Sequence, residues 1–315
     1  MISYYLLNVC VSIKSDWNRP LFTGKLVKSL LIDAEPRFKP LFEKSRGLPP
    51  KLVHITPLYE DNGGGRVRCV YSSAKVDTLN GRVLGVERVR VDGVYRFYVG
   101  FVEIDGGGVK QLKKTERDGV GVGFDLVYNA LLNIGGRHVF KGCVFDVELI
   151  SIQVEDVYKV VHGVIEGLEK GLDKLKIVFA SPTLLRDPLR SSKHKSLVPT
   201  PMNIFSTPVY IYLYLVGRLK SKTFYRLLVM MHKIFSEPYS LYSTTRIKWV
   251  VYGEDKKPIP ALTGYVNLHV NRSYYDEYAR RYNMEELLEN ILSTLATLGT
   301  GTSRATGFGH ISIHL

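Results

Sequence analysis

The chain has 315 residues, of which 45% are hydrophobic and 23% charged. This composition is that of an ordinary folded protein and excludes a disordered or fibrous one. At ~100–200 residues per domain, the length predicts about two domains. The 43 Lys and Arg residues exceed the 30 Asp and Glu residues by 13, and the pI is near 9.5. Such an excess favours a polyanionic partner, most commonly nucleic acid; basicity that serves solubility alone is the alternative.

The cysteines and apolar segments point to a cytoplasmic protein. Cys10, Cys69 and Cys143 are odd in number and far apart, and they form neither a disulfide framework nor a CxxC metal pair. The apolar start "MISYYLLNVCVSIK" lacks a basic leader and a cleavage site, and it predicts a strand rather than a signal peptide. The longest later apolar run, 209–216, is too short to cross a bilayer. We therefore expect no membrane partner.

The first half of the chain alternates between strand and helix patterns. A helix is expected from Pro20 to about Ile32, with an apolar stripe that includes Leu26 and Leu30. A second helix is expected from about Phe124 to Asn133. Strands are expected at 3–13, 49–58, 65–73, 95–104 and 139–154. The resulting order, β-α-β-β-α-β, is typical of a ferredoxin-like domain.

The second half predicts the same topology. After an amphipathic helix at 156–172, strands are expected at 174–182, 246–254, 261–270 and 310–315, and helices around 203–220 and 223–235. A last helix begins after Asn283, with Glu286 completing a capping box. The predicted fold is α+β, with two tandem ferredoxin-like domains. The domains are expected at 1–154 and 174–315, joined by a connecting helix at 155–173.

A glycine-rich loop at 299–309 precedes the final strand. Its order, helix then glycines then strand, is the reverse of a dinucleotide-binding fingerprint, and no Walker motif is present. Gly299 can end the preceding helix, and the remaining glycines let the main chain approach a large neighbour closely. That neighbour is either a ligand or the other domain, and the loop alone does not decide between them.

The loop "GTGTSRATGFGHISI" resembles the signature loop of the CRISPR-associated repeat-RNA endoribonucleases, the sixth Cas family within the RAMP group. "IVFASPTLLRDP", "LVPTPMNIFST" and "ALTGYVNLHV" resemble further segments of that family. The resemblance implies cleavage of precursor CRISPR RNA, without metal or cofactor, by the RNA's own 2′-hydroxyl, which leaves a cyclic phosphate and a 5′-hydroxyl. The sequence has no HExxH, DxD or clustered Cys/His motif, which agrees with a reaction that uses no metal. The implied partners are CRISPR repeat RNA and effector-complex subunits; both a monomer and a homodimer remain open.

The same resemblance suggests the catalytic residues. Many members use a histidine after the first helix, and Phe42 stands at that place here. Members without it rely on lysines, and Lys25, Lys28 and Lys51 match their positions. An unperturbed lysine, with a pKa of ~10.4, is a poor base at neutral pH, and we expect the neighbouring Lys25 and Lys28 to lower each other's pKa. His54 is a further candidate. The alternatives are solvated lysines and an ordinary strand histidine.

The candidates for RNA binding fall into two basic segments and the glycine loop. Contacts to phosphate add affinity without sequence information. The candidates are Arg186, Arg190, Lys193, His194, Lys195, Arg246, Gly299, Gly301, Thr302, Ser303, Arg304, Gly307 and Gly309. The segment "NRSYYDEYARRYN" interleaves tyrosine and arginine, which is compatible with base stacking but more typical of a surface helix.

Three other functions compete with the enzyme. A binder of repeat RNA that has lost cleavage would explain Phe42. A RAMP subunit of a CRISPR effector complex would bind RNA by shape. An unrelated basic interaction protein would leave the motif matches unexplained. Two complete halves with the terminal glycine loop favour the enzyme or the non-catalytic binder.

Overall fold

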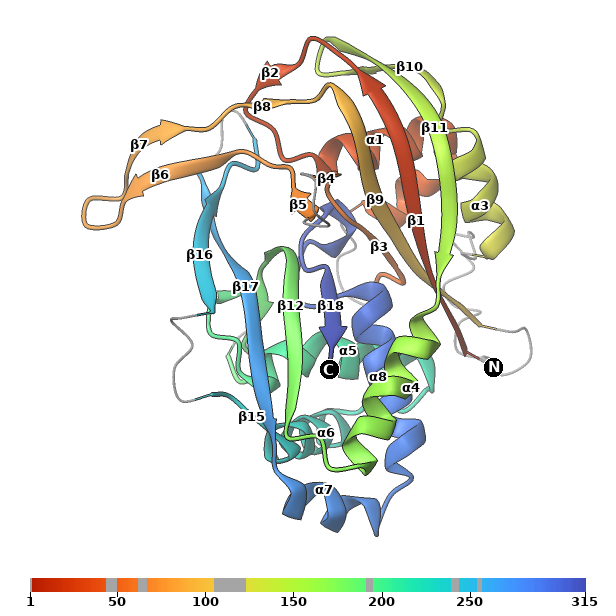
Figure 1. The fold of residues 1–315 in the computed structure, drawn as a ribbon, viewed down its shortest axis with the longest axis vertical. Coiled ribbons are helices and arrows are strands. Elements are labelled where there is room, and N and C mark those ends of the chain that lie inside the picture. The colour runs from red at the N-terminus through yellow and green to blue at the C-terminus, as the bar shows by residue number, and fades with distance from the viewer. Residues whose placement is uncertain are drawn as a thin grey trace.

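The computed structural model describes residues 2–43, 50–61, 67–104, 123–190, 195–238, 244–253 and 257–315. The chain forms two lobes, stacked along the longest axis of the molecule (Figure 1). Each lobe has an antiparallel sheet with helices packed on one face. None of the described helices is long and apolar enough to span a membrane.

The N-terminal sheet is built around β1 (Ile2–Lys14). This strand pairs with β11 (Cys143–Glu155) on one side and β9 (Gly93–Ile104) on the other, and β3 (Val53–Ile55) pairs with the far edge of β9. The spatial order β11-β1-β9-β3 is that of a ferredoxin-like sheet. The sheet is extended by β10 (Gly136–Phe140), β4 (Tyr59–Asp61) and β5 (Val67–Cys69). Helices α1 (Gly24–Ala34) and α3 (Phe124–Leu132) supply buried apolar residues to its core.

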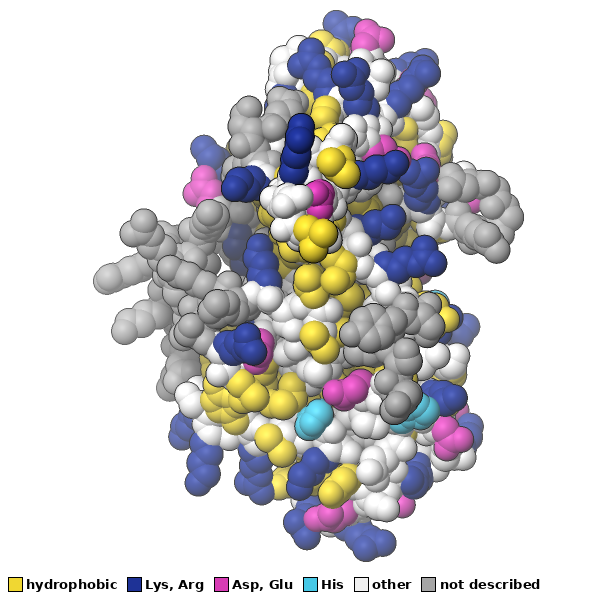
Figure 2. Space-filling view, turned by 90° about the vertical axis from the view of Figure 1, so that its left-hand side faces the viewer, with side chains coloured by type: hydrophobic (Ala, Val, Ile, Leu, Met, Phe, Trp, Pro, Cys, Tyr) yellow, Lys and Arg dark blue, Asp and Glu magenta, His cyan; other side chains and the backbone are white. Residues whose placement is uncertain are grey.

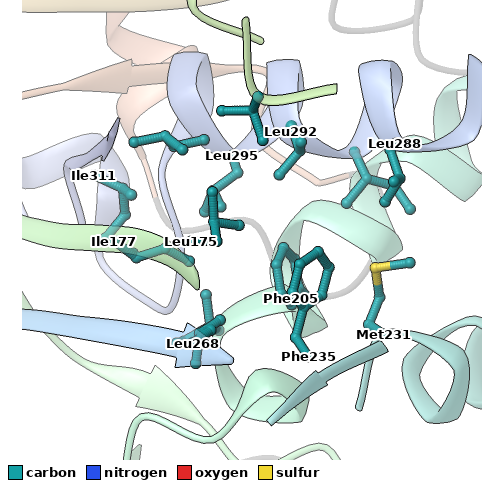
Figure 3. Close-up of a cluster of buried hydrophobic side chains, with 14 of the residues drawn as sticks. Leu175, Ile177, Phe205, Met231, Phe235, Leu268, Leu288, Leu292, Leu295 and Ile311 are labelled. Carbon is teal, nitrogen blue, oxygen red and sulfur yellow. The ribbon is translucent and has the colours of Figure 1, made fainter. Parts of the chain in front are cut away.

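The C-terminal sheet repeats this order. Its four main strands lie in the sequence β18 (Ile311–His314), β12 (Lys174–Thr183), β17 (Ile259–Val270) and β16 (Thr245–Val250). Helices α5 (Pro201–Leu215), α6 (Ser221–Ile234) and α8 (Met284–Leu298) pack against one face. In this core, Leu175 and Ile177 of β12 meet Phe205 of α5 and Leu295 of α8 (Figure 3). The predicted fold, α+β with two tandem ferredoxin-like domains, is confirmed.

Several shorter elements connect these strands and helices. Helix α4 (Val157–Glu169) lies between β11 and β12 and contributes to the C-terminal core. The remaining elements are β2 (Asn18–Arg19), η1 (Pro36–Phe38), α2 (Lys39–Phe42), β8 (Val89–Arg90), β13 (Leu185–Arg186), β14 (Lys195–Ser196), β15 (Phe235–Ser236), α7 (Arg272–Ala279) and η3 (Arg304–Thr306).

A hairpin from the first half of the chain extends the second sheet. Its strands β6 (Ser73–Asp77) and β7 (Arg82–Val86) form the orange arm in Figure 1. Strand β6 pairs with β16, opposite Trp249 and Val250. These strands were not predicted, since the expected strands end at residue 73 and resume at residue 95. The turn lies at Asn80 and Gly81, and Gly81 has a φ of 64°. This Asn-Gly pair is the sequence signal that would have predicted the hairpin.

Two predicted boundaries changed for local reasons, and a third is confirmed. Helix α1 begins at Gly24 rather than Pro20, because Leu21 hydrogen-bonds with Ser72 and Phe22 forms an antiparallel bridge with Tyr71. The predicted strand at 139–154 is a hairpin, turning at Lys141 and Gly142, both with positive φ. The cap of α8 is confirmed: Asn283 Oδ1 accepts a hydrogen bond of 3.3 Å from the backbone N–H of Glu286.

The two lobes meet where the end of α8 crosses the N-terminal sheet. A Cβ on Gly100 of β9 would lie 1.9 Å from the carbonyl oxygen of Thr297. Only glycine allows so close an approach. Beside this crossing, Tyr4 and Val102 pack against Leu298 in a separate apolar cluster. The glycine-rich loop follows α8 and therefore starts at the junction between the lobes.

Candidate functional site

The glycine-rich loop is fixed by backbone contacts with the rest of the protein. A Cβ on Gly301 would lie 2.3 Å from the carbonyl oxygen of Leu184, and one on Gly309 would lie 2.0 Å from that of Thr300. A Cβ on Gly299 would lie 2.2 Å from the carbonyl oxygen of Gly309, and one on Gly307 would lie 3.0 Å from the Cα atom of Gly24 in α1. All four loop glycines have positive φ. Packing against backbone therefore explains why glycine stands at all four positions. That these glycines contact RNA stays a prediction.

Arg304 joins the loop to the N-terminal lobe. Its side chain is buried, and its guanidinium donates to two backbone carbonyls: Nη1 to Leu298 at 2.8 Å and Nη2 to Lys51 at 3.0 Å. Burial lowers the pKa of Arg304 to about 10. Because both carbonyls are protein groups, these two hydrogen bonds give Arg304 a structural role. That Arg304 contacts RNA stays a prediction. Thr302 is half-buried and Ser303 is exposed, so these two side chains are the ones nearest to solvent among the predicted loop residues.

Lys28 and Lys51 come together beside Arg304. Lys28, on α1, is half-buried, and its Nζ donates to the carbonyl of Phe42 at 3.2 Å. Lys51 lies just before β3 and is also half-buried. Burial lowers the pKa of Lys51 to about 8, with further lowering by the charges of Lys28 and Arg304 and an opposing effect of Glu43. Burial also lowers the pKa of Lys28. We call Lys28 and Lys51 the lysine pair.

The side chain of Lys25 lies against the C-terminal lobe. Its Nζ lies 3.9 Å from the ring centroid of Tyr252, which follows β16 in the C-terminal lobe. The Tyr252 ring in turn packs against Phe22 and Phe308. The charges that shift the pKa of Lys51 come from Lys28, Arg304 and Glu43, and burial is what lowers that of Lys28. Lys25 is not among the causes of the lowered pKa of Lys28, whereas Lys28 lowers the pKa of Lys51.

His54 is fully buried between the lobes. Its Nδ1 lies 3.1 Å from the carbonyl oxygen of Arg304 and must carry the proton, because a carbonyl only accepts. Its ring stacks on that of His310, with centroids 5.6 Å apart, and His310 stacks on Tyr98 at 5.0 Å. Burial lowers the pKa of His54 well below its ordinary value. His54 is enclosed by protein in this structure. That it is catalytic stays a prediction.

The basic segment after β12 lies close to the glycine loop. Arg186 of β13 and Lys195 of β14 are exposed cross-strand partners, so two positive charges face each other. The backbone N–H of Thr302 donates to Leu184, next to β13, at 2.9 Å. Arg190 forms an ion pair of 3.2 Å with Asp187. Lys193 and His194 lie outside the described residues.

Positive charge is not confined to this segment. Arg246 is exposed on β16, in the C-terminal sheet. On the side of the molecule that carries the β6–β7 hairpin, Lys and Arg side chains clearly predominate over Asp and Glu (Figure 2). In the described part of the chain, no group of three His, Cys, Asp or Glu side chains is placed to hold a metal ion.

Sequence reasoning missed the partners of the lysine pair. Neither the Phe42 carbonyl nor Glu43 was predicted to act on these lysines, and no sequence signal places α2 beside α1 and the start of β3. The stacking of His54 on His310, 256 residues later in the chain, was likewise not foreseen. The contact of His54 with His310 joins the two halves of the chain, whereas Phe42 lies only 14 positions from Lys28.

The comparisons with known proteins give a consistent result for the fold. No family model matches the chain, and no curated protein matches it. Among solved structures, it is similar over 99% of its length to the full length of the protein chain in a Cas6 product complex, with a TM-score of 0.55 and 14% identity. A second Cas6 product complex gives 0.52 and 14%, with both chains fully covered. Cas6 of Thermus thermophilus gives 0.51 and 14%, with 99% of each chain covered. The chain has the Cas6 fold.

On this fold the lysine pair has a defined location. It lies where α1, the start of β3 and the glycine-rich loop meet, and it is joined to that loop by Arg304. The basic β13–β14 segment contacts the same loop from the other lobe. The site is thus assembled from both ferredoxin-like domains.

Proposed function

We propose that the chain is a metal-independent endoribonuclease that cuts CRISPR repeat RNA through attack by the RNA's own 2′-hydroxyl. The products would carry a cyclic phosphate and a 5′-hydroxyl. The observation that supports this proposal most is the lowered pKa of Lys51, about 8, next to Lys28 on a Cas6 fold. A strongly perturbed titratable group beside a second charge is typical of functional sites.

Lys51 is suited to accept the proton of the 2′-hydroxyl. With a pKa of about 8, roughly a tenth of the amine is neutral at pH 7, against less than ~0.1% for an unperturbed lysine. The attack forms the bond from O2′ to phosphorus and breaks the bond from phosphorus to O5′. The 2′ proton passes to Lys51, and the protonated Lys28 gives a proton to the leaving O5′.

Lys28 also stabilises the transition state. The attacked phosphorus gains negative charge on its oxygens, and a positive ammonium placed there lowers the barrier. A charge-assisted hydrogen bond of this kind is shorter and stronger than a neutral one. Lys25 remains a proposed third cation of the site, approaching it from the side of Tyr252. Arg186, Lys195, Arg246, Thr302 and Ser303 are proposed to hold the RNA.

Cleavage of a cognate repeat RNA in EDTA tests the proposal. We expect cleavage with EDTA present, and no cleavage of an otherwise identical RNA that has a single 2′-deoxy nucleotide at the cut site. The deoxy RNA should still bind with unchanged affinity. Cleavage of the deoxy RNA would overturn the mechanism, because it would require a hydrolytic nucleophile.

A non-catalytic repeat-RNA-binding protein is the second candidate. It is favoured by Phe42, which is buried and packs against Phe38 at the place where many members of the resembled family have a histidine. Intact repeat RNA after long incubation, together with tight binding, would favour this function. Binding of the protein to subunits of a CRISPR effector complex would then be assayed next.

A further inference from the structure

The ammonium of Lys28 has a fixed partner at the carboxyl end of α2. Its Nζ donates to the carbonyl of Phe42 at 3.2 Å, and Phe42 is the last residue of that helix. A carbonyl in the last turn of a helix has no partner within the helix, and a lysine side chain commonly supplies one. Lys28 is half-buried on α1. The contact therefore fixes the position of its amine between α1 and α2.

The ring of Phe42 anchors this carbonyl. It is buried with 3% exposure and packs edge-to-face on the ring of Phe38, with centroids 6.0 Å apart. Lys28 Nζ lies 5.9 Å from the centroid of the Phe42 ring, at the outer limit of ~6 Å for attraction between a cation and an aromatic ring. One residue thus offers Lys28 two groups that attract a positive charge, and the core of the N-terminal lobe holds that residue in place.

Glu43 adds a negative charge directly after α2. Burial lowers the pKa of both Lys28 and Lys51, and the charge of the exposed Glu43 side chain opposes this lowering. A carbonyl and an ionised carboxylate only accept hydrogen bonds, so they stabilise the ammonium and not the neutral amine. The carboxyl end of α2 therefore favours the charged form of the lysine that is bound to it.

Lys51 has the opposite surroundings. Burial lowers its pKa, and the positive charges of Lys28 and Arg304 lower it further. The Arg304 guanidinium is held beside Lys51 by its hydrogen bond to the Lys51 carbonyl. Neighbours of like charge favour the neutral form of an amine. Two side chains of the same type thus lie close enough to act on each other, in environments that favour different protonation states, as acid–base catalysis requires.

We propose that the carboxyl end of α2, formed by the carbonyl and ring of Phe42 and the carboxylate of Glu43, positions the Lys28 ammonium and keeps it charged, so that Lys51 is the amine that becomes neutral. Phe42 and Glu43 are positioning residues, because they act through Lys28 and not on the RNA. The inference rests on the proposed function only where it assigns the acid to Lys28 and the base to Lys51. It deepens that function by naming what separates two chemically identical side chains.

Two variants remove the two side chains of this helix end separately, each with a matched control. Glu43→Gln removes the carboxylate. Its control, Glu166→Gln, removes a carboxylate that also faces a lysine, Lys170 at 3.0 Å, but on the surface of α4. Phe42→Leu removes the ring. Its control, Phe38→Leu, removes the neighbouring buried ring of the same core.

The first readout needs no RNA. Protein isotopically labelled at lysine Cε is titrated by NMR, and the signals of Lys28 and Lys51 are identified by their loss in Lys28→Gln and Lys51→Gln. We expect Lys51 to lose its proton at lower pH than Lys28. Glu43→Gln should lower both midpoints by about half a pH unit, the size expected for one exposed charge. Phe42→Leu should lower the midpoint of Lys28.

Glu166→Gln should leave both midpoints unchanged. The inference would be overturned if Lys28 lost its proton before Lys51. Unmoved midpoints in both Glu43→Gln and Phe42→Leu would overturn it as well.

The second readout is single-turnover cleavage of repeat RNA across pH. Glu43→Gln should move the rising part of the rate profile to lower pH by about half a unit, which raises the rate below the midpoint about threefold. Phe42→Leu should lower the plateau about tenfold or more, because a displaced catalytic group loses most of its effect. Phe38→Leu should lower it clearly less at a similar loss of Tm. Equal plateaus in the two leucine variants would contradict positioning by the Phe42 ring.

The two readouts separate this inference from the proposed function. If the lysines titrate as expected but repeat RNA is never cut, the catalytic proposal fails and the division of charge stands. If repeat RNA is cut as proposed but Glu43→Gln and Phe42→Leu behave like their controls in both readouts, only the positioning by α2 fails. Thermal melting of each variant checks that the fold is retained.

Discussion

The buried guanidinium of Arg304 donates a hydrogen bond to the backbone carbonyl of Lys51, with 3.0 Å between Nη2 and the oxygen. This bond ties the glycine-rich loop, at the end of the chain, to the strand that begins next to the proposed base. It also brings a positive charge close to the Lys51 amine and helps to lower its pKa. One residue therefore serves the packing of the lobes and the electrostatics of the site.

Replacement of Arg304 should lower the free energy of unfolding and should also disturb the lysine pair. In Arg304→Ala, the carbonyls of Leu298 and Lys51 lose their donor, and each unsatisfied buried carbonyl costs about 1–3 kcal/mol. Urea unfolding measures the free energy of unfolding. Unchanged stability would show that the guanidinium does not hold the loop to the N-terminal lobe.

The pH dependence of cleavage should report the titration of Lys51. The rate of a single turnover should rise with pH and level off above about 8, where the amine is neutral. Lys51→Gln should lose cleavage by ~100-fold or more, since general-base catalysis contributes on this scale. Lys39→Gln, an exposed lysine on α2, serves as the control. A pH-independent rate would exclude Lys51 as the base.

Loss of the charge on Lys28 should move that pH profile. Because the Lys28 ammonium lowers the pKa of Lys51, Lys28→Gln should shift the midpoint of the rate profile to higher pH and also reduce the plateau. Profiles of wild type and variant are measured at saturating RNA. A reduced plateau with an unmoved midpoint would contradict the coupling between the two lysines.

Substitution of a loop glycine should damage stability before RNA binding. Gly301→Ala would place a Cβ 2.3 Å from the Leu184 oxygen at a φ of +76°. Gly81→Ala has a similar positive φ but nothing within 4 Å, so it isolates the backbone strain of about 1 kcal/mol. We expect Gly301→Ala to lower the Tm clearly more than Gly81→Ala. A direct contact between these glycines and RNA would instead lower the RNA affinity more than the Tm.

The junction between the lobes should weaken in acid. Burial lowers the pKa of His310 from 6.5 to about 4, and burial also lowers the pKa of His54. The unfolded chain then binds protons that the folded chain does not, so stability falls as the pH drops below 6.5 towards 4. The shift of His310 alone corresponds to about 3 kcal/mol. Urea unfolding of wild type and His310→Phe measures this slope, which should be shallower in the variant.

The repeated ferredoxin-like topology could be predicted from the sequence because its signals are local. Alternating and helical apolar periods mark the strands and helices, and the Asn283–Glu286 cap marks the start of α8. The basic character of the chain and the conspicuous glycine loop are also visible in the sequence. The lysine positions followed from a family resemblance, and these residues remain proposals for the site.

Tertiary structure alone decided which of these residues meet. Lys28 and Lys51 lie 23 positions apart, and Arg304 is 253 positions from Lys51. Whether each side chain is exposed or buried depends on which elements pack around it, and periodicity within one element does not contain that information. For the same reason the sequence could not show that His54 is enclosed by His310, that the loop glycines face backbone, or that the β6–β7 hairpin joins the second sheet. Pairing between distant strands and contact across the lobes fixed these outcomes.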